Sequence, residues 1–100
     1  MAVYVLAQVK IQDAAGFAAY AAAFGPTIGP FEGRVLAVDD DPDVLDGEWP
    51  EGRSVVIEFP SHEQARAWYD SEPYQAASEL RRAASISTMA VVAGYPRAGQ

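Results

Sequence analysis

The chain contains no cysteine, a single histidine and a single lysine. Without cysteine, disulfide bonds, thiolate metal sites and cysteine nucleophiles are excluded. Sites built on two histidines are excluded too, and we interpret His62, just after a predicted helix cap, as a solvated surface residue, with proton transfer as the alternative. Seven Lys and Arg stand against fourteen Asp and Glu, giving a formal net charge of -7. Because this charge repels phosphate groups, we expect no nucleic-acid partner and no membrane partner.

Long apolar runs are also missing. The longest, Phe17 to Phe24, is far shorter than the ~18 residues that a membrane span needs. No basic flank precedes an apolar stretch at the N-terminus, so no secretory signal is visible and we expect a cytoplasmic protein. Half of the residues are apolar and 21% are charged, which is typical of a globular protein. With no repeat and no shift in composition, the sequence predicts one domain over residues 1–100.

The pattern of apolar residues predicts an alternation of strands and helices. Strands are predicted at residues 3–9, 35–38, 54–59 and 86–93. Asp13 and Ser61 are suitable N-caps for helices over 14–24 and from 62 onward, and Pro73 suits the first turn of a further helix. This βαββαβ order predicts the α+β fold of a ferredoxin-like sandwich, in which helices cover one face of a four-stranded antiparallel sheet.

Two details of the helices follow from single residues. Pro26 removes a backbone donor and clashes with the preceding turn, so we expect the first helix to end at residue 24 and a separate helical turn to continue to about residue 30. In the later helices, helical spacing predicts that Trp68 and Tyr69 belong to the core, and that Tyr74, Ala77 and Leu80 point inward. We therefore interpret these aromatic residues as core and not as a ligand cage.

The acidic segment 39–52 suggests a calcium loop, but its spacing does not fit. An EF-hand needs Gly at position 6 and Glu at position 12. Neither Asp39 nor Asp41 as a first residue provides them. Gly-rich phosphate loops are also absent, so we expect no metal and no cofactor. Trp49 in this segment has three open interpretations: it plugs the end of the sheet, covers a pocket or reaches into a partner.

Glu58 is the most informative charge in the sequence. It alternates with residues that must face the helices, so we place it on the uncovered face of a central strand, beside Tyr4 and Gln8 of the neighbouring strand. If that face is wet, Glu58 is a surface acid. If it is covered, the carboxylate needs a cation such as Arg34 or Arg53. A structural ion pair and an acid or base at a site are the two alternatives.

Several segments resemble one bacterial family. The most specific are E-F-P-S at 58–61 and A-R-A-W-Y-D-S at 65–71, supported by Y-V-L-A-Q-V at 4–9 and W-P at 49–50. Over nearly its whole length the chain resembles the family called domain of unknown function 1330. The resemblance implies a ferredoxin-like fold that pairs as a dimeric α/β barrel. That superfamily also holds cofactor-independent monooxygenases, chlorite-dismutase relatives and muconolactone-isomerase-like proteins. In this chain the acids at 39–41 stand where relatives usually have small or basic residues.

Two hypotheses for function remain open. In the first, a small molecule is bound or transformed in a pocket between the open sheet face and the acidic segment, with Glu58 as acid or base. The residues that would bind the ligand are Tyr4, Gln8, Arg34 and Trp49. In the second, the protein is a non-catalytic dimer whose sheet face is only an interface. Both predict a homodimer, because two helical segments can cover only one face of the sheet, and neither specifies a reaction.

Overall fold

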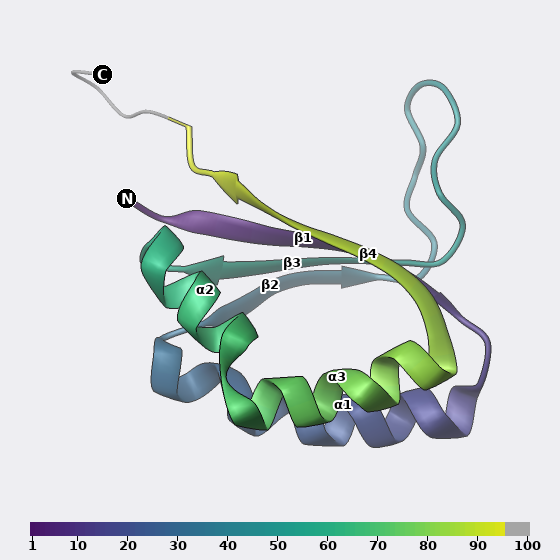
Figure 1. Ribbon diagram of the computed structural model, residues 1–100. Helices are drawn as coiled ribbons and strands as arrows, with labels where there is room; N and C mark the ends of the chain where they lie inside the picture. Colours follow the sequence, from purple (N-terminus) through teal and green to yellow (C-terminus); the bar gives the residue numbers. More distant parts are fainter. Residues whose placement is uncertain (96–100) are drawn as a thin grey trace.

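The computed structural model describes residues 1–95 (Figure 1). Its elements are β1 (Val3–Ile11), α1 (Ala14–Ile28), the 3-10 helix η1 (Gly29–Phe31), β2 (Arg34–Asp39), β3 (Arg53–Phe59), α2 (His62–Asp70), α3 (Glu72–Ala84) and β4 (Ser85–Ala93). The strands form one antiparallel sheet in the order β2-β3-β1-β4, and the helices lie on one side of it. The predicted ferredoxin-like α+β fold is confirmed. The predicted domain over 1–100 includes residues 96–100, which lie outside the described residues.

The helix caps follow the sequence, but the predicted end of the first helix is wrong. Asp13 accepts a hydrogen bond from the Gly16 amide at 3.2 Å, and Ser61 accepts one from the Gln64 amide at 3.1 Å. α1 continues through Pro26 to Ile28 instead of ending at residue 24. Pro26 cannot donate the helical hydrogen bond to the Ala22 carbonyl, and one residue further on the Thr27 hydroxyl donates to the Phe24 carbonyl at 2.6 Å. The apolar face continues beyond the proline, so packing outweighs the lost bond.

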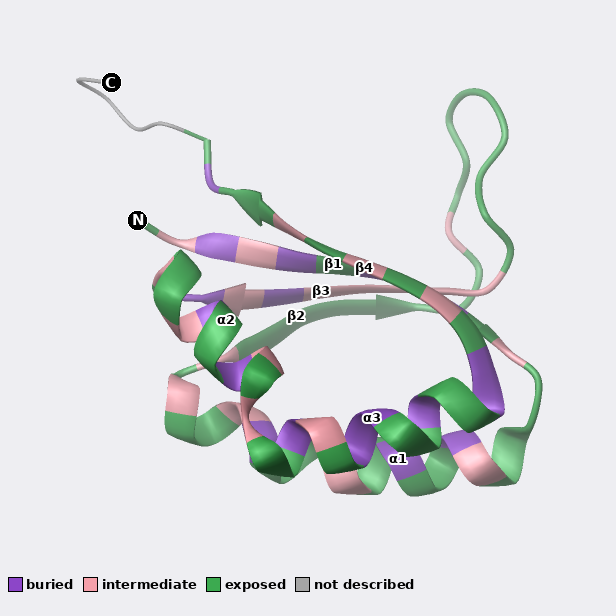
Figure 2. Cartoon of the chain, in the orientation of Figure 1, coloured by how far each residue is buried: buried purple, intermediate pink, exposed green. Residues whose placement is uncertain are grey.

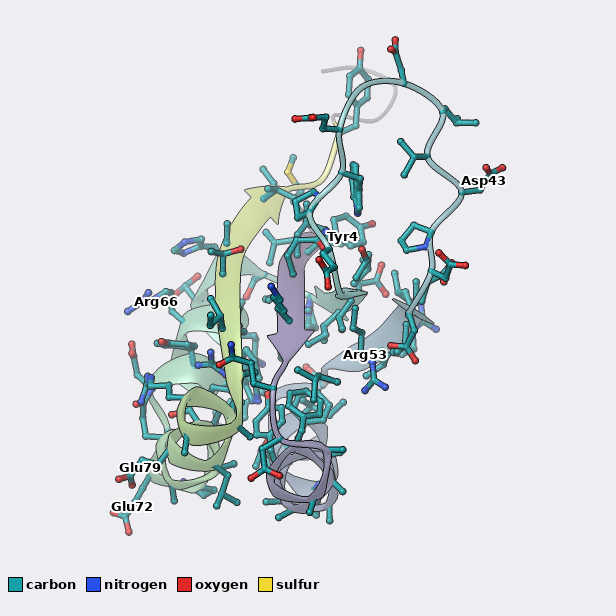
Figure 3. All side chains as sticks on the ribbon, turned by 90° about the vertical axis from the view of Figure 1, so that its right-hand side faces the viewer. Tyr4, Asp43, Arg53, Arg66, Glu72 and Glu79 are labelled. Carbon is teal, nitrogen blue, oxygen red and sulfur yellow. The ribbon has the colours of Figure 1, made fainter. Side chains whose placement is uncertain are left out.

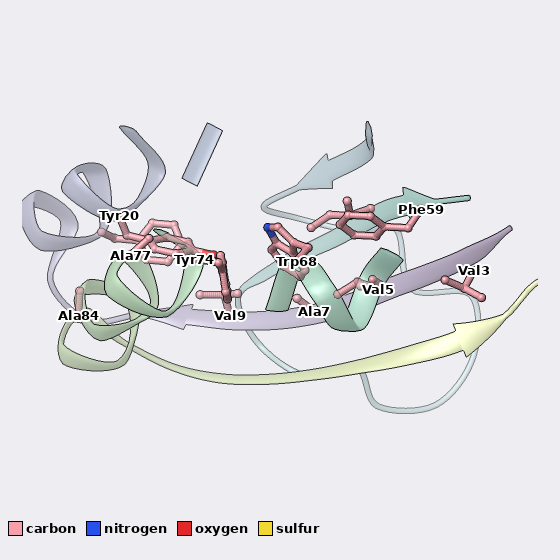
Figure 4. Packing of buried hydrophobic residues seen from close by; sticks show 13 residues of the cluster. Val3, Val5, Ala7, Val9, Tyr20, Phe59, Trp68, Tyr74, Ala77 and Ala84 are labelled. Atoms are coloured by element: carbon pink, nitrogen blue, oxygen red, sulfur yellow. The ribbon is translucent and has the colours of Figure 1, made fainter. Parts of the chain in front are cut away.

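The core lies between the sheet and the helices, where the buried residues gather (Figure 2). Alternate residues of β1 point into it, and Trp68 from α2 fills its centre (Figure 4). The Trp68 ring lies 4.1 Å from that of Tyr74 and 5.1 Å from that of Phe59, centroid to centroid. Its indole Nε1 donates to Thr27 Oγ1 at 3.0 Å, so its polar atom is satisfied as well. The prediction that Trp68 and Tyr74 are core residues is confirmed.

One residue of α3 lies on a different face from the one predicted. Leu80 is 41% exposed, so the prediction that it points inward is wrong. The buried stripe runs instead through Tyr74, Ala77, Ser78 and Arg81, at spacings of three and four residues. Leu80 lies off this stripe. The position that faces the sheet one turn after Ala77 is therefore occupied by the cation Arg81.

Residues 40–52 form a long loop that stands off the sheet on the side opposite the helices (Figure 1). In Figure 3 the labelled Asp43 lies on this loop, far from the helices. The loop returns to the sheet at Gly52, whose φ is +114° and where a Cβ atom would lie 2.3 Å from the Val9 carbonyl oxygen. Only glycine fits this close approach, so Gly52 fixes where the loop meets β3.

No helix within residues 1–95 is long and apolar enough to cross a membrane.

Candidate functional site

The sheet face away from the helices carries an apolar row between two polar rows. Leu6 lies opposite Val56 of β3 and Ala90 of β4, and Val56 lies opposite Ala37 of β2. On one side of this row are Tyr4, Glu58 and Arg34, and on the other are Gln8 and Ser54. Leu6 is 43% exposed although it is in the middle of the sheet. No described element covers this face, which we call the open face.

The structure brings Glu58 and Arg34 together on the open face. Arg34 Nη2 donates to Glu58 Oε1 at 2.7 Å. The Glu58 side chain retains 25% of its exposure, against 69% for Arg34. Glu58 thus lies in one row with Tyr4, partly buried and paired with a cation, as expected. Arg53 points to the other face of the sheet, where its hydrogen bonds to Asp40 lower the pKa of that carboxyl group.

Trp49 and Gln8 are joined through Ser54. Trp49 Nε1 donates to Ser54 Oγ at 3.2 Å, and Ser54 Oγ donates to Gln8 Oε1 at 3.1 Å. Trp49 therefore leans from the loop onto one end of the open face while remaining half exposed. The predicted site residues form two groups, Arg34–Glu58 beside Tyr4 and Trp49–Ser54–Gln8, with the apolar row between them. Their binding or catalytic role stays a prediction.

Two cavities lie on the other side of the sheet, among the helices. The first, which we call the α1 cavity, has a volume of about 170 Å³ and lies between α1 and strands β1 to β3. The second, the β4 groove, has a volume of about 830 Å³ and lies between β4 and helices α2 and α3. Arg81 and Met89 line both. Neither cavity includes Tyr4, Gln8, Arg34, Trp49 or Glu58.

Polar groups are concentrated between the two cavities. Arg81 Nη1 donates to Ser87 Oγ, while Arg81 Nε is buried and has no hydrogen-bond partner. The hydroxyl groups of Tyr20 and Tyr74 lie 3.0 Å apart, and that of Tyr74 lies 3.8 Å from the Met89 sulfur. These five residues connect α1, α3 and β4 in the middle of the core. Buried polar groups of this kind are costly unless they are satisfied, which makes them candidates for a functional role.

Tyr20 stays protonated in this cluster. Burial is the main cause that raises the pKa of its hydroxyl far above the usual range, and the neighbouring Tyr74 hydroxyl adds to the rise. The positive charge of Arg81 opposes the shift but does not cancel it. Tyr20 is therefore a hydrogen-bonding group here and not a base at neutral pH.

This shift predicts a loss of stability at high pH. Unfolded Tyr20 ionises near its ordinary pKa of about 10, while folded Tyr20 keeps its proton, so the stability is complete below about pH 10 and falls as the pH rises above it. We expect Tyr20→Phe to flatten this fall by on the order of 1 kcal/mol per pH unit, measured by urea unfolding from about pH 9 to pH 11. Equal slopes for wild type and variant would contradict the assignment.

The group of polar residues around Arg81 was not predicted from the sequence. The sequence does contain a pattern that indicates it, because Tyr74, Ala77, Ser78 and Arg81 follow helical spacing and therefore share one face of α3. Hydrophobicity favours Leu80 for the core instead, which conceals that Arg81 occupies the buried stripe. Residues 1–95 contain no group of three or more His, Asp or Glu side chains that could bind a metal ion.

The fold and the cavities define a class of protein: a small ferredoxin-like α+β domain with hollows between its sheet and helices. Within that class, the chain belongs to the family described as domain of unknown function (DUF1330), whose model matches residues 2–95. This confirms the resemblance seen in the sequence. No curated protein matches the chain significantly.

Solved structures support the fold. The protein of unknown function RPA0582 from Rhodopseudomonas palustris has 20% identity and a TM-score of 0.79, with 96% of this chain and 84% of that one covered. A dimeric ferredoxin-like protein of unknown function from Jannaschia sp. CCS1 has 10% identity and a TM-score of 0.67, with 94% and 100% covered. SnoaB, a cofactor-independent oxygenase from Streptomyces nogalater, has 14% identity and a TM-score of 0.60, with 99% and 98% covered. At these identities the likeness extends to the fold alone.

Proposed function

We propose that the protein is a homodimer that binds a small, largely apolar molecule on the helix side of its sheet. The observation that carries this proposal is the α1 cavity, because of its apolar lining and its volume. Its wall is mainly apolar and includes Phe17 and Phe24 of α1 and Val55 and Ile57 of β3. An engineered apolar cavity of about 150 Å³ in another protein holds benzene, so about 170 Å³ is enough for one six-membered ring.

Binding of a neutral ring tests this proposal. Toluene should shift the methyl resonances of Val35, Val38 and Val55, which line the cavity, and leave those of Val92 on the open face unchanged. Ala21→Leu adds volume to the cavity wall and should weaken toluene binding at least tenfold. Ala22→Leu, one position along α1 and outside the cavity, is the matched control. Shifts confined to the open face would contradict binding in the α1 cavity and support the pocket that the sequence predicts on the open face.

The open face supports the homodimer. Its apolar row, with Leu6 at the centre, is left uncovered by the chain's own described elements, and burying such a surface against a second copy is favourable. A two-fold pair of sheets is the simplest closed arrangement. Neighbours of the same fold are described as dimeric. In this proposal the open face is an interface, and the Arg34–Glu58 pair is structural.

Light scattering coupled to size exclusion, at low micromolar concentration, measures the assembly. We expect twice the chain mass of 10.7 kDa. A mass of one chain would contradict pairing through the open face. That the protein acts as one domain, in the bacterial cytoplasm, stays a prediction of the sequence.

A further inference from the structure

Arg81 is the one arginine of the described chain that is buried. It is 6% exposed, in a position between the α1 cavity and the β4 groove. Burying a guanidinium ion in a core removes its hydration, which is very unfavourable unless an anion or several acceptors replace the water. The side chains that offer Arg81 a hydrogen bond in the structure are those of Ser87 and Tyr20, and both are neutral hydroxyl groups. Within residues 1–95 the Nε of Arg81 has no hydrogen-bond partner.

The other arginines within residues 1–95 make the contrast clear. Arg34, Arg53 and Arg66 each have a carboxylate within 4 Å, from Glu58, Asp40 and Asp70 respectively. Arg82 is exposed, and its Nη2 donates to the Tyr69 hydroxyl at 3.4 Å. Among the described ion pairs none includes Arg81. The chain has twice as many acidic as basic residues, so a shortage of carboxylates does not explain why Arg81 is unpaired. The most buried cation of the described residues thus has no counter-charge, whereas Arg82, which also lacks one, is exposed to solvent.

The cavities beside Arg81 are free of acids too. None of the residues that line the α1 cavity or the β4 groove is Asp or Glu. The groove contains two further arginines, Arg66 and Arg82, together with His62. Figure 3 shows Arg66 on the outer side of β4, while Arg53 lies on the opposite side of the molecule. In a protein with a net charge of -7, the surroundings of Arg81 therefore favour an anion and repel a cation.

We propose that Arg81 binds the carboxylate of a small ligand whose apolar part, about the size of one ring, occupies the α1 cavity. The inference rests on the proposed function and adds the ligand's charge to it. A carboxylate matches the planar guanidinium and forms charge-assisted hydrogen bonds with it. It supplies the negative charge that the core lacks. The ring fills the apolar hollow on the α1 side, and the groove beside β4 gives the charged end access to solvent.

Benzoate and benzamide form the probe pair, because they share shape and ring and differ in charge. We expect benzoate to bind at least tenfold more tightly than benzamide, and to raise the melting temperature more at equal concentration. The buried Nε–H of Arg81 gives a direct readout, since its NMR resonance should move on addition of benzoate. This comparison uses the wild-type protein and does not depend on the folding of any variant.

Variants then assign the effect to Arg81. Arg81→Met should lower benzoate affinity at least tenfold and leave benzamide and toluene binding unchanged. Lys10→Met is the control for the loss of one positive charge, because Lys10 is exposed and lines neither cavity, and it should change benzoate affinity less than threefold. If benzoate and benzamide bind equally and Arg81→Met changes neither, the inference fails while the proposed function stands. If no probe, toluene included, binds at millimolar concentration, both fail.

Discussion

Replacement of Trp68 by alanine should lower the free energy of unfolding by about 3–5 kcal/mol. The side chain is fully buried and contacts the rings of Phe24, Phe59 and Tyr74, with centroid distances of 6.2, 5.1 and 4.1 Å. Truncation to alanine would leave a cavity in the middle of the core and remove the hydrogen bond to Thr27. Urea unfolding at a fixed protein concentration measures the loss, since a dimer's stability depends on concentration.

Trp49→Ala is the matched control for this prediction. Trp49 is 51% exposed and donates one hydrogen bond, to the exposed end of the sheet, so its loss should cost less than about 1 kcal/mol. A Trp68→Ala protein with the urea midpoint of the wild type would remove Trp68 from the core. The two tryptophans are the only ones in the sequence, so each variant also assigns the fluorescence of the other.

The second large effect is expected on assembly. Leu6→Glu places a carboxylate in the middle of the apolar row, where pairing would bury it without a cation from its neighbours Val56 and Ala90. Burying an unpaired charge costs several kcal/mol, so the dimer should weaken at least about a hundredfold. The monomer should keep its fold, because Leu6 is 43% exposed within it. Sedimentation or light scattering over a concentration series measures the change.

Leu80→Glu controls for the added charge. Leu80 has nearly the same exposure, 41%, but lies on α3, on the opposite side of the sheet. This variant should assemble as the wild type does. Equal weakening by both substitutions would indicate that net charge, and not the open face, governs assembly. An unaffected Leu6→Glu dimer would move the interface to another surface.

The strands could be predicted from the sequence because their residues alternate in hydrophobicity and the sheet uses that alternation directly. All four strands lie where expected, within two residues at each end. The prediction at Pro26 is wrong because local rules describe the lost hydrogen bond and not the packing that follows it. The α1 helix continues because Thr27 and Ile28, which follow the proline, pack against the core, where Thr27 also accepts a hydrogen bond from Trp68. A rule for one residue is outweighed by contacts distant in the sequence.

The candidate sites divide in the same way. Alternation decides the face on which a side chain lies, so the sequence predicts Glu58 on the same face as Tyr4, with Arg34 as one of two possible cations, and the structure pairs them. Arg81 is harder to identify, because a charged residue at a buried helical position contradicts the expectation that charges face water. Hydrophobicity favours Leu80, one residue away. A cavity forms where side chains from several helices and strands pack incompletely. Because these elements are distant in the sequence, no local pattern predicts its position.

The irregularity in β2 has a consequence for solubility. β2 is a free edge of the sheet, exposed along its whole length, and its apolar residues Val35, Leu36 and Val38 would be an attractive template for another strand. The register shifts between Val35 and Ala37, so a bulge interrupts the regular spacing of backbone groups that a joining strand would need. Edge-to-edge addition would continue without limit into a fibre, whereas pairing of two faces stops at two copies. One extra residue in this edge strand thus makes the addition of a further strand at β2 unfavourable.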